Sequence, residues 1–464
     1  MLWDNRLIAP SNDRKFRSAS RPPLRRPNQP TRSKMPTKEI SASLDLENER
    51  MRVGTLQWSG ESNLATFEYD PAFLKSGLNI SPFNLKPAAG AIAAKPLPFD
   101  GLHGAFADSL PDGWGKFLVH RQIIVSGRKL SAMTPLDHLA ITGLRGMGAL
   151  TYEPHESIVA APTGSLQLYY LARQANRAPI VMIELDQQAA QTMLAASGSA
   201  AGAKPKIMIL RDPEYGDLRF DTVEIKLDRF EHWLLKLTLK KDGQDTGKVE
   251  HAYAQMARAA GIDFPKTILV KDETGISHFA VKRFDRTATG RLHVHSLAGL
   301  LDADIRIPSL DYTDFLKVTK ILTDDHLQVE EAFRRMVFNI LVQNRDDHAK
   351  NHAFLMNRTG HWKLSPAYDI THSKGICNQH NMTVAGAGKE PQQEHILKVA
   401  QDSGIPPITA KRVIDEVASA LVSWPKHAED AGISAAVTLT IGARIDSQAK
   451  ITLDLAGLIS KASV

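Results

Sequence analysis

The segment Gln343–His352 reads QNRDDHAKNH and places a dense polar cluster between two apolar runs, Met336–Val342 and Ala353–Met356. Charged groups held between two core-facing segments are costly to bury unless they are paired with one another or bind a cation. Within the cluster, four residues separate Asp346 from Asn351. We therefore interpret this segment as a functional loop that a folded core holds in place.

The composition is that of an ordinary globular protein. The 464 residues are 43% hydrophobic and 23% charged, and this length predicts two to four domains. A single cysteine, Cys377, excludes an internal disulfide and a cysteine-based zinc site, and it is typical of a reducing compartment. No segment is long and apolar enough to span a bilayer, so we expect no membrane contact.

Positive charge is concentrated at the N-terminus. Residues 1–38 contain ten Lys or Arg and two Asp, a net charge of +8, so the rest of the chain, whose total is +6, carries about −2. The basic pI is therefore no ground for nucleic-acid binding by the folded part. Six prolines and few large apolar residues predict that residues 1–40 form a disordered basic tail, or a leader ahead of a start nearer Met35 or Met51.

Periodicity indicates strands first and helices later. Residues 51–58 and 64–69 alternate apolar and polar side chains around a turn, which is typical of a hairpin. The Gly-rich segment 143–148 favours a turn over a phosphate site. Beyond Ser296 the pattern is mainly helical, and an amphipathic helix over 329–341 leads into Gln343–His352.

Three features between residues 195 and 260 provide candidate phosphate-site residues, and each has an ordinary alternative. The small-residue loop 195–206 brings glycine N–H groups and lysines together ahead of a short strand, or it is a flexible linker. Lys236 lies in the apolar strand 232–239, where it either meets a partner or extends to solvent. Glu250 begins the helix 249–260, where a glutamate also favours the helix dipole.

The order of these features narrows the interpretation. They are followed by a strand pair within 267–281 that ends at residues 282–286, then by Asp346 and Asn351, then by Asp369 after a hairpin. A protein kinase presents its phosphate cover, lysine, glutamate, hinge, catalytic loop and metal-binding aspartate in this order. Phosphoryl transfer requires such a set, because cations must neutralise the phosphates and a carboxylate must orient the attacking hydroxyl.

Six motifs carry a resemblance to a known family. The most specific are D-x-H-A-K-N from Asp346 to Asn351 and P-x-Y-D-I from Pro366 to Ile370. The others are Phe106–Gly115 (FADSLPDGWG), Ser199–Lys206 (SAAGAKPK), Leu234–Leu237 (LLKL) and Arg283–Arg286 (RFDR). Over nearly all of residues 50–420, the chain resembles the HipA family of bacterial toxin kinases.

The resemblance implies an α+β protein with a bilobal protein-kinase-like fold. A small β-rich N-terminal subdomain would precede a mainly helical C-terminal lobe. The expected divisions are the tail (1–40), a HipA N-terminal subdomain (41–160), a nucleotide-binding part similar to a kinase N-lobe (161–290) and a helical catalytic C-lobe (291–464).

The resemblance also implies roles for residues of an ATP- and Mg²⁺-dependent serine/threonine protein kinase in the bacterial cytoplasm. Asp346 is expected to be the catalytic base, and Asn351 and Asp369 are expected to be metal ligands. Ser199 matches the family's autophosphorylated serine, whose modification ejects the loop and blocks ATP. The expected ATP-binding residues are Gly202, Lys206, Lys236, Glu250, Lys282, Phe284 and His348.

As partners, the resemblance implies a small helix-turn-helix antitoxin of the HipB type and, through that complex only, operator DNA. The implied substrate is a protein, with an aminoacyl-tRNA synthetase as one candidate and growth arrest as the outcome.

Two positions depart from the family's best-known member, which has glycine at Asp347 and an acid at Lys282. Asp347 adds negative charge beside Asp346 and predicts a raised pKa for that base. We expect a lysine at position 282 to be compatible with the hinge, since the contacts of a hinge can be made by main-chain groups.

Two alternatives stay open. Asp346, Asp347, His348 and His352 form a ligand-rich set that suggests a metal-dependent hydrolase, although no general-base glutamate lies between the histidines. The second alternative is a non-catalytic pseudokinase that acts as a co-repressor with a DNA-binding antitoxin. The complete set of kinase residues argues against it.

Overall fold

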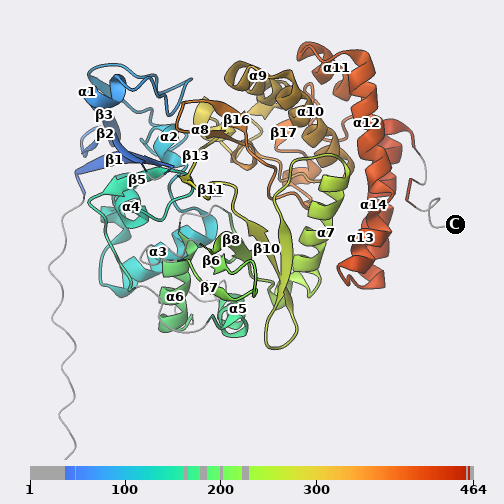
Figure 1. Ribbon diagram of the computed structural model, residues 1–464, viewed down its shortest axis with the longest axis horizontal. Coiled ribbons are helices and arrows are strands. Elements are labelled where there is room, and N and C mark those ends of the chain that lie inside the picture. Colours follow the sequence, from blue (N-terminus) through green and yellow to red (C-terminus); the bar gives the residue numbers. More distant parts are fainter. Residues whose placement is uncertain are drawn as a thin grey trace, which may run out of the picture. The chain divides into compact units, whose positions relative to one another are not determined.

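The computed structural model describes residues 37–47, 49–160, 166–177, 185–198, 202–221, 229–455 and 458–459, which belong to one compact unit that begins at Pro36. Along the chain, an N-terminal sheet is followed by a second sheet with flanking helices and then by a mainly helical region (Figure 1). The predicted α+β class and the order of its parts are confirmed. Residues 1–36 of the predicted tail lie outside the described residues, but the predicted bound at residue 40 is wrong, because Glu39 and Ile40 begin the first strand.

The N-terminal sheet is antiparallel and has the strand order β4-β3-β2-β1-β5. The predicted hairpin is β2–β3, in which Leu56 lies opposite Phe67. The strand β1 was not predicted, yet it pairs with both β2 and β5 and buries Ile40, Ala42 and Leu44. The strands are β1 (Glu39–Leu46), β2 (Glu49–Ser59), β3 (Leu64–Tyr69), β4 (Ala91–Ala93) and β5 (Leu150–Glu153).

Four short helices and one 3₁₀ turn belong to this N-terminal part. They are α1 (Pro71–Leu74), α2 (Gly104–Ala107), α3 (Gly113–Val125), η1 (Leu130–Ala132) and α4 (Pro135–Thr142). The glycine-rich segment that follows α4 is a turn, as predicted. Its Gly148 N–H donates to Asp285, and Arg286 donates to the carbonyls of Gly146 and Gly148. The turn therefore ties the N-terminal part to the segment after the second sheet.

The second sheet is antiparallel, with the order β7-β6-β8-β10-β9. Its strands are β6 (Lys206–Arg211), β7 (Leu218–Phe220), β8 (Glu231–Lys236), β9 (Thr267–Lys271) and β10 (Ser277–Lys282). Its helices are α5 (Leu168–Arg177), α6 (Gln187–Ser197) and α7 (Thr246–Ala259), with the 3₁₀ turn η2 (Lys240–Asp242) before α7. Ile207, Trp233 and Leu235 bury one face of the sheet in a core shared with α3, α5 and α6. The helix α7 packs against β9 and β10.

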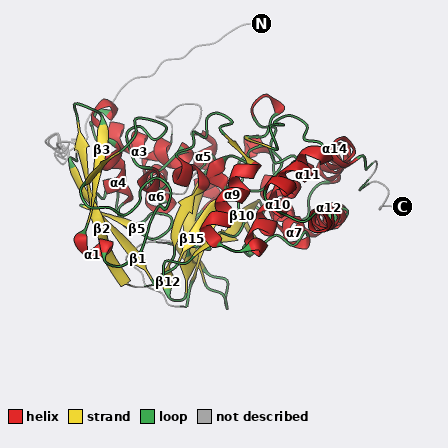
Figure 2. Cartoon of the chain, turned by 90° about the horizontal axis from the view of Figure 1, so that it is seen from above, coloured by secondary structure: helices red, strands yellow, loops and turns green. Residues whose placement is uncertain are grey.

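The remaining chain is mainly helical, and its long helices gather at the end away from the N-terminal sheet (Figure 2). The helices are α8 (Leu297–Leu301), α9 (Tyr312–Thr323), α10 (His326–Leu341), α11 (Gln393–Asp402), α12 (Pro407–Leu421), α13 (Trp424–Asp430) and α14 (Ala435–Leu453). The short strands are β11 (Arg286–Thr287), β12 (Gly290–Arg291), β13 (His293–Ser296), β14 (Leu310–Asp311), β15 (Ala353–Met356), β16 (Trp362–Leu364) and β17 (Met382–Thr383), with 3₁₀ turns η3 (Ala349–Asn351) and η4 (Ile376–Asn378).

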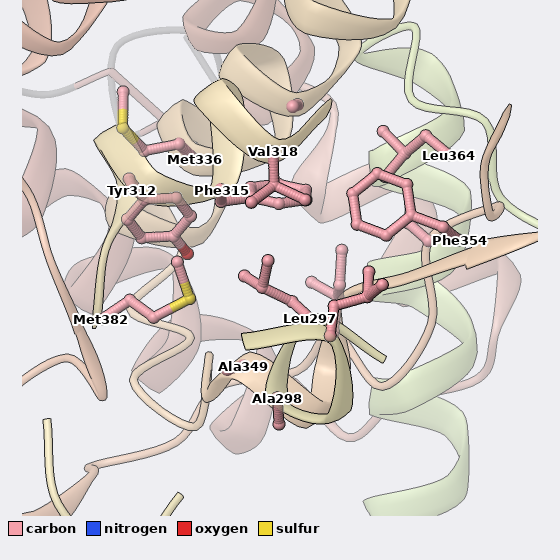
Figure 3. Packing of buried hydrophobic residues seen from close by; sticks show 14 of the residues in the cluster. Leu297, Ala298, Tyr312, Phe315, Val318, Met336, Ala349, Phe354, Leu364 and Met382 are labelled. Carbon is pink, nitrogen blue, oxygen red and sulfur yellow. The ribbon is translucent and has the colours of Figure 1, made fainter. Parts of the chain in front are cut away.

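The polar segment Gln343–His352 is held between a buried helix and a buried strand. The helix α10 buries Met336 and Val337 before it, and β15 buries Phe354 after it. Figure 3 shows side chains from α8, α9 and β15 facing one another across this core, with Ala349 of the polar segment beside α8. The loop thus has fixed ends, as the flanking apolar runs predicted. Among the described residues, no helix has the length and apolar character to cross a membrane.

Candidate active site

Lys236, at the end of β8, joins two carboxylates from distant parts of the chain. Its ammonium donates to Glu250 of α7 and, at 2.5 Å, to Asp369. Burial lowers the pKa of Lys236, but the charges of Asp369 and Glu250 outweigh burial, and the net effect is a raised pKa. Of the two alternatives for this lysine, a buried partner is therefore correct, and the residue is only 8% exposed.

Lys206 opens β6 directly opposite Lys236, so two buried lysines lie side by side on neighbouring strands. Burial, helped by the charge of Lys236, lowers the pKa of Lys206 to about 8, against the opposing effect of Asp369 and Asp112. Gly202 lies close to the same ammonium. A Cβ on Gly202 would stand 2.5 Å from Nζ of Lys206, and the residue has a φ of +105°. Only glycine fits this position without strain.

Asp369 lies in the segment after β16, and its backbone is in the left-handed region with a φ of +55°. A non-glycine residue in this conformation stores local strain and needs surrounding contacts to hold it. Burial raises the pKa of Asp369, but Lys236 and Lys206 outweigh burial and hold the pKa well below its ordinary value. The carboxylate is therefore charged at neutral pH and faces two cations.

The catalytic-loop candidates Asp346 and Asn351 are linked through the main chain. The Asn351 side-chain nitrogen donates to the Asp346 carbonyl at 2.7 Å, which leaves the amide oxygen to act as a ligand. The Asp346 carboxylate is 58% exposed, and its Oδ1 lies 3.7 Å from Nε2 of His348. Tyr368, which precedes Asp369, donates to the carbonyl of Lys350 at 2.8 Å, so the loop and the Asp369 segment are in direct contact.

Asp347 differs from its neighbour Asp346 in its surroundings. It is buried and accepts hydrogen bonds from His380 (2.7 Å), the Tyr312 hydroxyl (2.8 Å) and the N–H of Asn381 (2.8 Å). Burial raises the pKa of Asp347, but these partners, led by His380, outweigh burial and lower the pKa. Asp347 thus anchors the loop to the core. The prediction that the charge of Asp347 acts on Asp346 assumed two carboxylates in the same surroundings. Asp347 is instead buried, whereas Asp346 is exposed.

This arrangement also bears on the hydrolase alternative. Asp347 is engaged by His380, and the ring of buried His352 packs 4.3 Å from that of Phe315. Within the described residues, no group of three or more His, Cys, Asp or Glu side chains is arranged to hold a metal ion. Asp346, Asp347, His348 and His352 therefore do not converge as a ligand set.

The two predicted hinge residues, Phe284 and Lys282, make different kinds of contact. The ring of Phe284 lies 5.6 Å from that of Tyr368 and so borders the Asp369 segment. The Lys282 ammonium pairs with Glu231 at 2.7 Å, and its N–H donates to the carbonyl of Lys266. The ammonium and the main-chain N–H of Lys282 are thus used within the protein, and its role in ATP binding stays a prediction. Ser199 lies outside the described residues.

The donors present fit a nucleotide and its divalent cation. Asp369 and Asn351 offer the oxygen ligands that Mg²⁺ prefers, and such sites are often completed by phosphate oxygens and water. Lys206 and Lys236 supply two positive charges beside Asp369, and Gly202 lies close to Lys206 with its own N–H donated to Asp112. Lys236, Glu250 and Asp369 meet directly, while Asp346 and Asn351 connect to them through Lys350 and Tyr368.

Sequence reasoning did not predict that Asp112 and Lys350 meet and connect the two parts of the site. Asp112 accepts a hydrogen bond from the N–H of Gly202 and another from the Lys350 ammonium at 2.7 Å. Both lie inside motifs that were noted, FADSLPDGWG and DxHAKN, but no local pattern indicated that they meet. The contact spans 238 positions of sequence.

Comparisons with known proteins agree with this fold. The family model described as "HipA N-terminal domain" matches residues 44–153, and the model described as "HipA-like C-terminal domain" matches residues 198–424. In a solved structure of the Shewanella oneidensis MR-1 toxin–antitoxin system HipA, HipB and operator DNA complex, one chain is 14% identical, with a TM-score of 0.62. The match covers 90% of this chain and 99% of that one.

Two curated relatives are similar over shorter regions. A "Putative kinase" from Haemophilus influenzae is 27% identical over 37% of this chain and 52% of its own length. A "Putative kinase Y4dM" from Sinorhizobium fredii is 32% identical over 30% of this chain and 36% of its own length. The chain thus spans about half the length of the first relative and about a third of the second. With both HipA domain models matched in order, the chain belongs to the HipA family.

Proposed function

We propose that this protein is an ATP- and Mg²⁺-dependent serine/threonine protein kinase. The observation that carries the proposal is the contact of buried Lys236 with buried Glu250 and half-buried Asp369, which come from a strand, a helix and a loop after a hairpin. A lysine held by a helix glutamate beside a metal-ligand aspartate is what phosphoryl transfer requires. The names of the two curated relatives support a kinase in general.

In this proposal each group has a distinct task. Lys206 and Lys236 bind phosphate oxygens, and Glu250 holds Lys236 in position. Asn351 and Asp369 hold Mg²⁺, which supplies neutralisation of the charge on the phosphates when bound. The exposed carboxylate of Asp346 accepts the proton of the attacking hydroxyl. Phe284 borders the base of the nucleotide, and His348 lies beside Asp346.

We further propose that the kinase is the toxin of a HipA-type toxin–antitoxin pair, with a HipB-like antitoxin and, through it, operator DNA. The support is family membership and the fold shared with the Shewanella complex. The substrate class is a protein hydroxyl, with an aminoacyl-tRNA synthetase as one candidate target, and Ser199 is the proposed site of autophosphorylation.

The test is transfer of the γ-phosphate from labelled ATP to the purified protein, followed by mass spectrometry of the region around Ser199. We expect Mg²⁺-dependent phosphate on Ser199 in the wild type and incorporation roughly 10²–10⁴-fold slower in Asp346→Ala. A Ser199→Ala variant that incorporates the same phosphate would refute the assignment of the site. Nucleotide binding without any transfer, to the chain or to a candidate synthetase, would instead favour the pseudokinase alternative.

A further inference from the structure

The motif FADSLPDGWG has no task in the proposed chemistry, yet its aspartate contacts both halves of the candidate site. Asp112 comes from the N-terminal part, immediately before α3. One carboxylate oxygen accepts from the N–H of Gly202, and the other accepts from the Lys350 ammonium at 2.7 Å. Gly202 belongs to the predicted phosphate-binding loop, and Lys350 lies next to the metal-ligand candidate Asn351.

Among the described residues, the Asp112 carboxylate makes hydrogen bonds to Gly202 and Lys350 rather than to its own helix. An aspartate at a helix N-cap ordinarily accepts a hydrogen bond from the first turn of its own helix. Asp70 does so before α1, and Asp325 does so before α10, whereas Asp112 makes no such bond to α3. Its carboxylate is instead directed to two segments that are distant in sequence.

The main chain around Asp112 reinforces the contact. Trp114 N–H donates to the carbonyl of Gly202 at 3.1 Å. Gly113 has a φ of +42°, and a Cβ on it would lie 2.5 Å from the same carbonyl oxygen. The two backbones therefore touch, and the N–H and C=O groups of Gly202 are both bound by this one motif. A side chain at position 113 would push the loop away.

Charge explains why an aspartate suits this place. The carboxylate binds a lysine ammonium and also lies near enough to Lys206 to oppose the lowering of that group's pKa. A carboxylate that accepts two hydrogen bonds, one of them from a cation, gives a stronger restraint than a neutral amide.

We infer that Asp112 is a positioning residue that fixes the phosphate-binding loop to the catalytic loop, so that nucleotide binding depends on the N-terminal part of the chain. This inference rests on the proposed function. Asp112 touches neither nucleotide nor metal in this account. It acts by holding Gly202 and Lys350 at fixed positions relative to each other.

The test combines amide hydrogen exchange at Gly202 with titration of ATP in the presence of Mg²⁺. The variants are Asp112→Asn, which can still accept from Gly202 but not from Lys350, and Asp112→Ala, which loses both contacts. The matched control is Asp70→Asn, an ordinary N-cap in the same N-terminal part. We expect Asp112→Ala to exchange at Gly202 roughly tenfold faster or more and to bind ATP roughly tenfold more weakly, with Asp112→Asn between it and the wild type.

A double-mutant cycle with Lys350→Met separates this role from general stability. If the two side chains act as a pair, Asp112→Asn adds little to the effect of Lys350→Met on the KM for ATP. Unchanged exchange at Gly202 in Asp112→Ala, or effects equal to those of Asp70→Asn, would overturn the inference. If the wild type binds no nucleotide, the proposed function fails, whereas the exchange measurement still decides whether Asp112 holds the loop.

Discussion

Lys236 and Asp369 form a partly buried ion pair although 133 positions separate them in the sequence. The same ammonium also binds Glu250, so one cation serves two carboxylates, and Lys206 on the neighbouring strand supplies the second positive charge. The four groups balance in charge. Because Lys206, Lys236 and Glu250 are buried and Asp369 is half-buried, removal of any one leaves an uncompensated charge in a poorly solvated site.

Removal of the Lys236 ammonium is expected to cost both folding stability and nucleotide binding. In Lys236→Met, Glu250 and Asp369 lose their shared partner, and we predict a loss of about 3–5 kcal/mol in the free energy of unfolding. Urea denaturation gives this number, and fluorescence titration with an ATP analogue gives the affinity. The control is Lys95→Met, which breaks an exposed pair with Asp302 and should cost less than about 1 kcal/mol. Equal losses in the two variants would contradict the account.

The neighbours Asp346 and Asp347 are expected to separate catalysis from stability. Asp346→Ala should lower the rate of phosphate transfer by roughly 10²–10⁴-fold with little change in stability, because its carboxylate is exposed. Asp347→Asn should lower the free energy of unfolding by about 1–3 kcal/mol, because it disturbs the buried bonds to His380 and Tyr312. Unchanged transfer by Asp346→Ala would end its assignment as the base.

Lys206 is expected to make ATP binding depend on pH near 8. Burial lowers the pKa of this group to about 8, and a bound phosphate favours the protonated form, so binding above that pH must take up a proton. Affinity should therefore fall as the pH rises from 7 to 9, by up to about tenfold per pH unit above 8. Lys206→Arg keeps its charge and should flatten the profile. A wild-type affinity that stays constant over this range would contradict the assignment.

Acid should destabilise the fold through buried histidines. Burial lowers the pKa of His103, His138 and His293 to about 4 and that of His352 to about 3. The unfolded chain takes up these protons first, near pH 6.5, so stability falls as the pH drops below that value, by up to about 1.4 kcal/mol per pH unit for each histidine. Denaturation at pH 7.5 and 5.5 measures the slope. His293→Gln should reduce it, and exposed His361→Gln should not.

Elements with strong periodicity could be predicted from the sequence. The hairpin β2–β3, the helices α7 and α10 and the pair β9–β10 were all indicated by local alternation or amphipathic spacing. β1 was missed although its apolar residues Ile40, Ala42, Leu44 and Leu46 alternate with polar ones, because its first residues were assigned to the basic tail.

The candidate site was predictable in its composition and less so in its geometry. The order of Lys236, Glu250 and Asp369 along the chain pointed to a shared site, but each residue alone had an ordinary interpretation. The burial of Asp347 beside the exposed Asp346 follows from its bonds to His380 and Tyr312, which no spacing in the sequence indicated. The contact of Asp112 with Gly202 and Lys350 likewise depends on tertiary packing alone.

Mg²⁺-dependent ATP binding to the wild type and to Asp369→Asn, measured by titration calorimetry, tests the central claim most directly. If Asp369 is a metal ligand beside Lys236, ATP should bind the wild type much more tightly with Mg²⁺ than without it. The variant should lose that difference. Equal affinity for ATP in the two proteins, with the same response to Mg²⁺, would contradict the claim.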